Sequence, residues 1–542
     1  MRGVGIFLIV AALIAGLVGY VSPSQNLEIR TWYDLDAIRN NLDGNYILMN
    51  DLDSNTPGYE QLAGPTANGG KGWQPIGTFL PRTESAPTAF NGTCDGQGYE
   101  IRDALINRPD EPVVGLFSEV GLGGIIKNLG VAHTYVNFGV TETGPTSAYR
   151  CAGGLVGENY GTVDNCYFDG GVGEKSSAGC LVGRNYGAVK NSFSSGQVRG
   201  TGSIGGLVGD NGGLVSNCYS TSYVEFSTGG TGGGLVGRNI GGTVMCSYST
   251  GSVHGGNVGG GLVAVNNGSV SRCYATGGVF GKNISSGGLV GLNNGSVSDS
   301  YSTGGVSGNS FVGGLVGLND GSVSNSYSAG SVTGNSFVGG LVGENEGGAV
   351  TESFWDTETS GQAASAGGTG KTTAEMQAIT TFPGTAWNIT PVTPNHPDYS
   401  CIWNIVDTAT YPFLSWFLGC HEGHTSPTQT TTETTPLGYL QLTVSPAQVC
   451  VAAGEQIKIR CYIYCLINTI VDINSVDVVL FDSHDAILRQ RRMTMNSPWS
   501  AYTICAIVGD EAYYRMKVNF AIRGDGKYSE YGAYSFPIVV KT

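Results

Sequence analysis

Residues 287–306 read GGLVGLNNGSVSDSYSTGGV, and residues 313–332 read GGLVGLNDGSVSNSYSAGSV. The two stretches are nearly identical and begin 26 residues apart. The phrase GGLVG, with a single change in two copies, recurs eight times between residues 151 and 350, at spacings of 26, 26, 28, 27, 27, 26 and 26 residues. A fixed period of this length is the sequence signature of a stacked-repeat protein.

Each repeat carries a Leu, an Asn four residues later, and an aromatic residue eight or nine residues after that Asn. The Leu and Asn positions define the structural repeat, and they are Leu155, Asn159, Leu181, Asn185, Leu207, Asn211, Leu235, Asn239, Leu262, Asn266, Leu289, Asn293, Leu315, Asn319, Leu341 and Asn345. The aromatic positions are Tyr167, Phe193, Tyr219, Tyr248, Tyr274, Tyr301, Tyr327 and Phe354.

The fold class follows from the short segments inside each repeat. Three segments (LVG, V-x-x-S-Y-S and G-x-V) are separated by Asn- and Gly-rich turns, and each is too short for a helix. Equivalent strands of successive coils bury their apolar sides by stacking in register, about 4.8 Å apart. We therefore predict an all-β chain built on a parallel β-helix solenoid with capping segments, and we expect right-handed winding, the usual hand of parallel crossovers.

The recurring Asn and aromatic side chains are predicted to have structural roles. Asn tolerates turn geometry, and stacked Asn side chains hydrogen-bond as a ladder, so a ladder is favoured over a metal or sugar ligand. The aromatic residues are expected to stack along the rod. Cys166, Cys218 and Cys273 lie in alternate coils, about 9.6 Å apart and too far for a disulfide, so they are predicted to be small buried residues.

The net charge and the N-terminal sequence limit which locations and partners the protein can have. The chain has 27 basic and 42 acidic residues, a net charge of −15, which argues against nucleic acid and anionic membrane surfaces as partners. Only 17 charged residues lie between positions 151 and 350. Residues 1–22 contain one Arg and a long apolar run, which predicts a secretory signal peptide or, as the alternative, an uncleaved N-terminal membrane anchor.

Less regular units precede the repeats. Thr31 is a predicted helix cap, followed by Leu35, Ile38 and Leu42 at helical spacing and a strand at NYILM. GWQPIG, FNGTCDGQGYEI, GLF and IKNLGV then follow in order. Asp51-x-Asp53-x-Asn55 begins like a calcium loop but lacks its Gly and its bidentate Glu, so a turn is favoured and calcium stays the alternative.

Together these motifs resemble the GLUG-motif repeat family and the segment that usually precedes its repeats, over about residues 29–420. The resemblance implies a secreted or surface-attached, adhesin-like β-helix, and it implies no activity, since function depends on a site. Some relatives of this kind are metallopeptidases. Their H-E-x-x-H motif is not matched by His421-Glu422-Gly423-His424, whose histidines are three residues apart.

The stretch SAGGTGKTTAEM (residues 365–376) looks like a phosphate-binding loop. A Walker loop needs a buried strand before it and a Gly at its first position, where this chain has Ser365. Thr372 and Glu375 instead match a capping box at the start of a short helix. We therefore interpret the stretch as part of the cap that ends the β-helix, and we expect no nucleotide and no cofactor.

The predicted domains are residues 23–131, an N-terminal cap with irregular coils; 132–356, the repeats; 357–424, a C-terminal cap; 425–436, a Thr/Pro-rich linker; and 437–542, a string of strands that suggests an immunoglobulin-like β-sandwich. Cys401 and Cys420 form a possible disulfide within the C-terminal cap.

The predicted function is that of a secreted or cell-surface structural protein, adhesin-like and not an enzyme, which presents binding surfaces to glycans or proteins. The alternative is a carbohydrate-active β-helix enzyme resembling polysaccharide lyases or glycosidases. That alternative requires clustered carboxylates, or carboxylates with Arg or Lys, on one face. We expect that the carboxylates of the repeat region do not recur at one repeat position, which disfavours such a cluster. They are Glu158, Asp164, Asp169, Asp210, Asp299 and Asp320.

Overall fold

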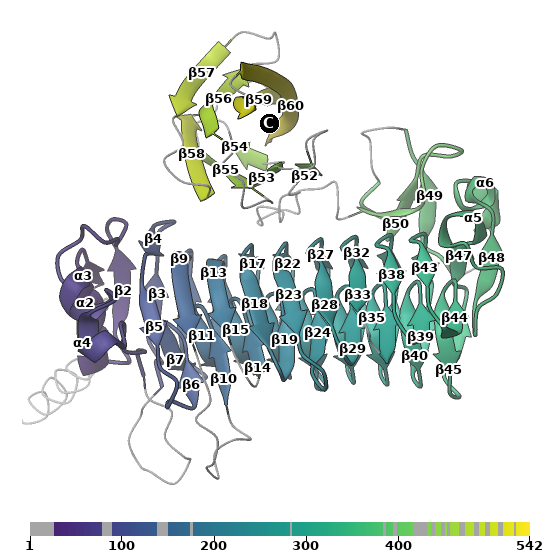
Figure 1. Ribbon diagram of the computed structural model, residues 1–542, viewed down its shortest axis with the longest axis horizontal. Coiled ribbons are helices and arrows are strands. Elements are labelled where there is room, and N and C mark those ends of the chain that lie inside the picture. Colours follow the sequence, from purple (N-terminus) through teal and green to yellow (C-terminus); the bar gives the residue numbers. More distant parts are fainter. Residues whose placement is uncertain are drawn as a thin grey trace, which may run out of the picture.

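The computed structural model describes residues 26–77, 89–137, 150–173, 177–281, 284–382, 386–393 and 398–415, followed by strand segments between 431 and 541 whose side chains are not described. The predicted signal segment, residues 1–22, lies outside the described residues. Within them, no helix is long and apolar enough to cross a membrane. Figure 1 shows a β-solenoid with α2–α4 at one end and α5 and α6 at the other.

The all-β parallel solenoid predicted from the repeat is confirmed. Two of its sheets have nine strands each, so nine coils stack along the axis, about 40 Å at the usual spacing. The additional coil precedes the first sequence repeat and contains the GLF motif. We call one nine-stranded sheet the Asn sheet; its strands are β7 (Phe117–Val120), β11 (Val156–Asn159), β15 (Val182–Asn185), β20 (Val208–Asn211), β25 (Val236–Asn239), β30 (Val263–Asn266), β35 (Val290–Asn293), β40 (Val316–Asn319) and β45 (Val342–Asn345).

The other nine-stranded sheet contains the strand that directly precedes each GGL turn, and we call it the arch sheet. Its strands are β6 (Val113–Val114), β10 (Cys151–Gly153), β14 (Ser177–Gly179), β19 (Ser203–Gly205), β24 (Thr231–Gly233), β29 (Val258–Gly260), β34 (Ser285–Gly287), β39 (Ser310–Gly313) and β44 (Ser336–Gly339).

A twelve-stranded sheet, the Val sheet, extends into the N-terminal region. Its strands are β1 (Leu27–Ile29), β2 (Asn45–Leu48), β3 (Thr93–Asp95), β8 (Ile125–Lys127), β12 (Thr162–Asp164), β16 (Ala188–Lys190), β21 (Leu214–Ser216), β26 (Thr243–Met245), β31 (Ser269–Ser271), β36 (Ser296–Ser298), β41 (Ser322–Ser324) and β46 (Ala349–Thr351).

The remaining face, the aromatic sheet, carries the aromatic residue and the last Val of each repeat. It contains β4 (Glu100–Arg102), β5 (Leu105–Asn107), β9 (Gly130–Asn137), β13 (Tyr167–Gly173), β17 (Phe193–Ser194), β18 (Gln197–Gly200), β22 (Tyr219–Ser220), β23 (Tyr223–Phe226), β27 (Tyr248–Ser249), β28 (Val253–Gly255), β32 (Tyr274–Ala275), β33 (Val279–Gly281), β37 (Tyr301–Ser302), β38 (Val306–Ser307), β42 (Tyr327–Ser328), β43 (Val332–Thr333), β47 (Phe354–Asp356) and β48 (Thr369–Lys371).

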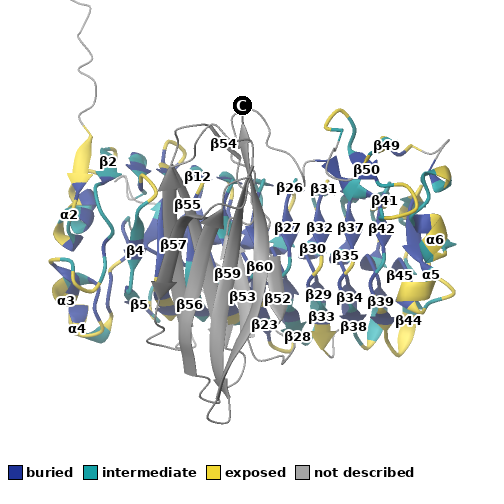
Figure 2. Cartoon of the chain, turned by 90° about the horizontal axis from the view of Figure 1, so that it is seen from above, coloured by how far each residue is buried: buried dark blue, intermediate teal, exposed yellow. Residues whose placement is uncertain are grey.

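Burial follows the repeat. Figure 2 shows mostly buried strands along the rod, with exposed residues at its turns and ends. All eight repeat Leu side chains are fully buried, together with the Val column of the Val sheet from Val163 to Val323. This identical stacking supplies a continuous apolar core although most of the strands are only two to four residues long.

The arch and Asn strands of one coil pack against each other at unusually short range. A Cβ atom added to Gly260 would lie 2.5 Å from the carbonyl carbon of Val263 in the same coil. A Cβ added to Gly287 would lie 2.6 Å from the carbonyl carbon of Val290. Only Gly leaves room for backbones to approach this closely, which explains why the first Gly of the GGLVG phrase is present in all eight copies.

Both ends of the core are capped. At the N-terminus, α2 (Trp32–Asp36) begins with the predicted cap, and Thr31 and Asp34 form a capping box. A 3-10 helix (Ala37–Asn40), α3 (Tyr59–Leu62) and α4 (Ala67–Gly70) follow, and Trp32, Leu35 and Ile38 are buried in the core. At the other end, the Oγ of Ser365 accepts hydrogen bonds from the backbone N–H groups of Leu341 and Val342, the latter at 2.8 Å.

The C-terminal cap continues onto the aromatic face. It contains α5 (Thr357–Ser360), α6 (Thr373–Met376), a 3-10 helix (Ile379–Thr381), β49 (Ile389–Pro391), β50 (Trp403–Ile405) and β51 (Phe413–Leu414). Trp387 and Trp403 pack against Tyr327, and Tyr327 donates a hydrogen bond to the carbonyl of Pro412 at 2.7 Å. This packing covers the aromatic column of the last coils.

Residues 431–541 form two separate sheets. One contains β52 (Thr431–Thr434), β53 (Leu440–Ser445), β55 (Gln456–Cys465) and β58 (Trp499–Ile507). The other has the order β54 (Cys450–Ala452), β60 (Lys527–Lys541), β59 (Tyr513–Gly524), β56 (Asp472–Phe481) and β57 (Ile487–Met493). All pairings except that of β54 with β60 are antiparallel.

Several buried hydroxyls have no hydrogen-bond partner among the described residues, and three of them lie in one column of the core. These three belong to Ser249, Ser302 and Ser328, which follow the aromatic residue in their coils and are fully buried. Leaving a buried hydroxyl unpaired costs about 1–3 kcal/mol. Ala275 occupies the same position in another coil, which shows that the solenoid accepts a methyl group there.

We therefore expect Ser302→Ala to raise the free energy of unfolding by about 1 kcal/mol. The matched control is Ser194→Ala, because the Ser194 hydroxyl occupies the same column but donates to the Gly206 carbonyl at 2.6 Å. That variant should lose stability. Urea unfolding followed by circular dichroism measures both, and equal destabilisation by the two substitutions would contradict the expectation.

Candidate functional site

The repeat asparagines lie inside the corner of each coil and bond to one another. The side-chain N–H of each Asn from Asn159 to Asn319 donates to the side-chain oxygen of the Asn in the next coil, at 2.8–2.9 Å. The seven from Asn159 to Asn319 are fully buried. Their amides are therefore used within the fold and are not presented to a metal or a sugar.

The aromatic residues form a second column along the rod. The rings from Tyr167 to Tyr327 stack with centroids 4.8–5.0 Å apart and interplanar angles of 2–7°. Burial raises the pKa of Tyr274 and of Tyr327 well above the usual tyrosine value. Because the ring faces cover one another and most of the rings are buried, the column has a structural role.

Cys166, Cys218 and Cys273 are buried, as predicted. Burial raises the pKa of the Cys218 thiol to about 12 and that of the Cys166 and Cys273 thiols further. Such thiols are poor nucleophiles and poor metal ligands at neutral pH. Cys401 is half-buried beside Asp398, whereas Cys420 lies outside the described residues, so their pairing stays a prediction.

The GGTGKTT stretch is part of the cap at the C-terminal end of the solenoid. The predicted capping box is present, since the Thr372 hydroxyl accepts from the Glu375 N–H and the Glu375 carboxylate accepts from the Thr372 N–H at 2.9 Å. Residues Thr369–Lys371 form the short strand β48 rather than the loop expected from the sequence, because they pair with β47. Lys371 lies 3.5 Å from Glu375.

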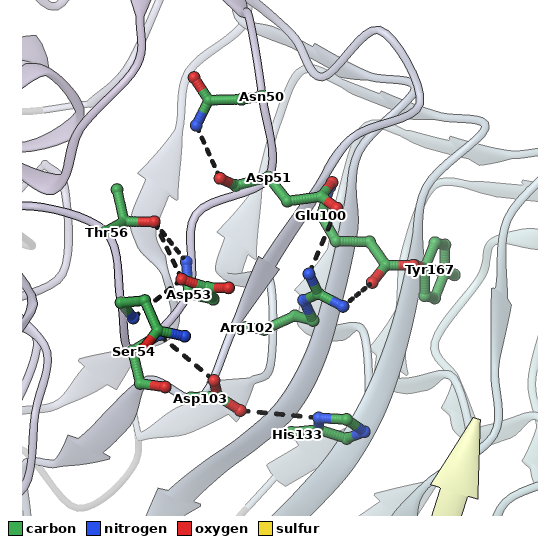
Figure 3. A network of polar contacts seen from close by, with 11 residues as sticks. Asn50, Asp51, Asp53, Ser54, Thr56, Glu100, Arg102, Asp103, His133 and Tyr167 are labelled. Carbon is green, nitrogen blue, oxygen red and sulfur yellow. Dashed lines mark hydrogen bonds and ion pairs between the residues drawn. The ribbon is translucent and has the colours of Figure 1, made fainter. Parts of the chain in front are cut away.

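One cluster of charged residues joins the N-terminal cap to the first coils (Figure 3). The Arg102 guanidinium lies 3.3 Å from Asp51 and 3.6 Å from Glu100, and the Tyr167 hydroxyl donates to Glu100. The Glu100 backbone N–H also donates to Asp51 at 2.8 Å. These contacts connect segments about fifty residues apart, and they fix the cap to the aromatic sheet.

The residues resembling a calcium loop form a turn in this cluster. The Asp53 carboxylate accepts from the Asn55 backbone N–H at 2.9 Å and from the Thr56 hydroxyl at 3.1 Å. The Asp51 carboxylate forms an ion pair with Arg102. Among the described residues, no group of three or more His, Cys, Asp and Glu side chains is arranged to hold a metal ion.

His133 and Asp103 form the titratable part of the same cluster. The His133 Nδ1 lies 3.6 Å from the Asp103 carboxylate, which also accepts from the Ser54 N–H. The hydrogen bond to Asp103 raises the pKa of His133, which Asp169 raises further and Arg102 opposes. The same contact, followed by the Ser54 bonds, lowers the pKa of Asp103 in spite of its burial.

The pair should therefore stabilise the fold most at mildly acidic pH. A raised histidine pKa gives stability that is lost as pH rises through that pKa, and a lowered aspartate pKa gives stability that is lost as pH falls through it. His133→Asn keeps a residue that tolerates the left-handed backbone at φ 50°. Because His133 is half-exposed, we expect the variant to lower Tm by only about 1–2 °C at pH 5.5 and by less at pH 8.5. Equal losses at both pH values would contradict the assignment.

A second charged column lies on the Asn sheet and contradicts the expectation that the carboxylates do not recur at one repeat position. Glu158, Arg184, Asp210 and Arg238 pair in register, so Glu158 and Asp210 do recur at one repeat position. Asp210 is 2% exposed, lies 3.0 Å from Arg238 and 3.5 Å from Arg184, and accepts from the Ser177 hydroxyl at 2.7 Å.

This column is a ladder of charges that alternate from Glu158 to Arg238, and Glu119 pairs in register with Glu158 at its start. Glycosidases place two carboxylates on either side of an open site, and one of them carries a raised pKa. Here Arg184 lies between Glu158 and Asp210, and Glu158 accepts a hydrogen bond from Tyr160 at 3.1 Å. Aligning the repeats position by position would have revealed the column from the sequence.

Comparison with known proteins confirms the resemblance to the GLUG repeats. The family profile described as the GLUG motif matches residues 148–173. The chain is 36% identical over 139 residues to a protein of Evansella cellulosilytica described as a Gly-rich membrane protein, and the match covers 25% of this chain and 14% of that protein. It is 31% identical over 165 residues to the halomucin of Haloquadratum walsbyi, covering 27% of this chain and 2% of that protein. No solved structure matches significantly.

Proposed function

We propose that this chain, which carries the GLUG motif, is a structural protein of the cell surface or its surroundings, whose solenoid is a stiff rod that presents binding surfaces to glycans or other proteins. The observation that carries the proposal is the uninterrupted stacking of nine coils closed by a cap at each end. Such a solenoid is a quasi-one-dimensional scaffold with a long outer surface. The names of the two relatives, a membrane protein and a halomucin, support a surface location.

The composition of the outer surface supports the same proposal. The repeat region carries few charged side chains for its length, and its exposed positions are largely Ser, Thr, Asn and Gly. The charged side chains at the two clusters described above are paired within the fold. A surface of this kind favours hydrogen bonding to neutral polar partners over strong electrostatic attraction.

The C-terminal module is proposed to be an immunoglobulin-like sandwich. Its two sheets have the orders β52-β53-β55-β58 and β54-β60-β59-β56-β57, which contain the runs β53-β55-β58 and β60-β59-β56-β57. If β53 is strand A, these runs correspond to A-B-E and G-F-C-C′, the arrangement of immunoglobulin domains. Within the predicted linker 425–436, Thr431–Thr434 form β52 and pair with β53, so the linker between this module and the rod is the part that precedes β52. Residues 1–22 direct export or anchor the chain.

Antibody labelling of intact cells tests the proposed location. An antibody raised against the solenoid should label the surface of unpermeabilised cells or precipitate the protein from the medium. External protease should remove the signal, whereas an intracellular marker should stay intact. Deleting residues 1–22 should abolish surface labelling, and labelling confined to permeabilised cells would contradict the proposal.

A further inference from the structure

Phe311 and Phe337 occupy the same position in two successive coils and adopt an unusual backbone. Their φ angles are 48° and 50°, in the left-handed region that bulky residues avoid. In the preceding coils this column of the arch sheet holds Thr231, Val258 and Ser285, none of which has a positive φ. The strained backbone is therefore specific to the two Phe positions.

The shape of the arch explains why the backbone changes at Phe. The Ser285 side chain points between the two strands of its arch, where its hydroxyl donates to the Gly291 carbonyl at 2.7 Å, and it is 4% exposed. A phenyl ring is too large for that space, so it turns outward. Phe337 is 55% exposed, Phe311 is half-buried, and the two rings stack with centroids 5.1 Å apart.

Packing within the solenoid does not account for these two residues, because a Ser fits the position without strain. Strained residues that are retained in spite of their cost cluster at ligand-binding sites. The neighbouring side chains are polar and neutral. Asn335 donates to the Asn309 side-chain oxygen at 2.8 Å, and the hydroxyls of Ser310 and Ser336 lie 2.9 Å apart.

We infer that this strip, formed by Phe311, Phe337, Asn309, Asn335, Ser310 and Ser336, binds a neutral polysaccharide that runs along the rod; the inference rests on the proposed function and specifies its ligand. Sugar rings have apolar C–H faces, which pack on aromatic rings, and hydroxyl rims, which bond to amides and hydroxyls. Each of the two coils supplies one aromatic ring, one amide and one hydroxyl to the strip, and the coils are about 4.8 Å apart.

The charge and size of the strip favour this ligand over others. Asp320 is the only charged residue between positions 301 and 343, so an anionic or cationic polymer gains little from this surface. Two phenyl rings are also far smaller than the roughly 800 Å² per partner that a stable protein interface buries. A second copy of the chain is therefore the less favoured occupant.

The test compares the full chain with Phe311→Ser/Phe337→Ser in affinity electrophoresis through gels containing hydroxyethylcellulose, xylan, mannan or amylopectin. At least one polymer should retard the unsubstituted protein, and the double variant should bind it at least tenfold more weakly. The double variant should melt at the same temperature or higher, because the substitution removes backbone strain. The matched control is Phe280→Ser, which removes an exposed Phe from the aromatic sheet and should leave binding unchanged.

Three results would overturn the inference: retardation by none of the polymers, equal binding by the double variant, or a lower melting temperature that accompanies the loss of binding. A change from dimer to monomer in light scattering, caused by the double substitution, would also overturn it in favour of self-association. Surface labelling of cells is measured separately, so failure of the polysaccharide site is distinguishable from failure of the proposed location.

Discussion

Gly287→Ala is expected to disrupt the coil that contains it, with a loss of stability above about 4 kcal/mol. The added Cβ would lie 2.6 Å from the Val290 carbonyl carbon and 2.8 Å from the backbone N of Gly317, and closer still to the Val290 oxygen. These atoms belong to the backbone of the same arch and of the next coil. They cannot move without breaking the parallel pairing of two sheets, so the clash cannot be relieved locally.

Gly305→Ser in the same repeat is the matched control. A Cβ there would meet only the Ser331 hydroxyl, at 3.0 Å, and the equivalent positions of other coils hold Ser252 and Ser331. This variant should change stability by less than about 0.5 kcal/mol. Urea unfolding and hydrogen exchange of the affected coil measure both effects. A Gly287→Ala protein as stable as the control would show that the arch is less tightly packed than the structure indicates.

The repeat could be predicted from the sequence because its physical cause is local and periodic. A strand of three or four residues buries one side only by stacking, so the recurrence of Leu155 and its seven counterparts is sufficient to predict parallel coils. The caps follow similarly from local rules, since Thr31 with Asp34 and Thr372 with Glu375 are capping boxes. The extra coil at residues 113–120 lacked the motif and was therefore not counted.

Features that depend on contacts between coils were harder to predict. The corner two residues before each aromatic has a left-handed backbone with φ of 44–53°. Only half of the eight positions hold Asn, as at Asn165, and others hold residues such as Arg272 and Glu352, so no residue type in the sequence marks this column. Arg102 meets Asp51 only because the irregular N-terminal coils bring distant segments together. The outward turn of Phe311 depends on the narrow space inside the arch, which no periodicity reveals.

Asn266→Ala is expected to lower the free energy of unfolding by about 3 kcal/mol, because it interrupts the buried ladder at its centre. The Asn266 side chain donates to Asn293 at 2.8 Å and to the Ser296 carbonyl at 3.2 Å, and it accepts from Asn239 at 2.8 Å. Its removal leaves a donor on one neighbour and an acceptor on the other without this partner. Each such buried polar group costs about 1–3 kcal/mol.

The adjacent residue is a control that differs mainly in burial. Asn267 also accepts a hydrogen bond from the next coil, from Asn294 at 2.8 Å, but both side chains are exposed to water, which replaces the lost bond. Asn267→Ala should therefore cost at most about 0.5 kcal/mol.

Asn266→Asp distinguishes the contribution of the hydrogen bonds from that of side-chain packing, because an ionised carboxylate has nearly the same shape as the amide but cannot donate to Asn293. Burial raises the pKa of such a carboxyl group, so this variant should regain stability as pH falls and the group protonates. Equal stability of the Asn266 and Asn267 alanine variants in urea would show that the buried amides contribute little to holding the coils together.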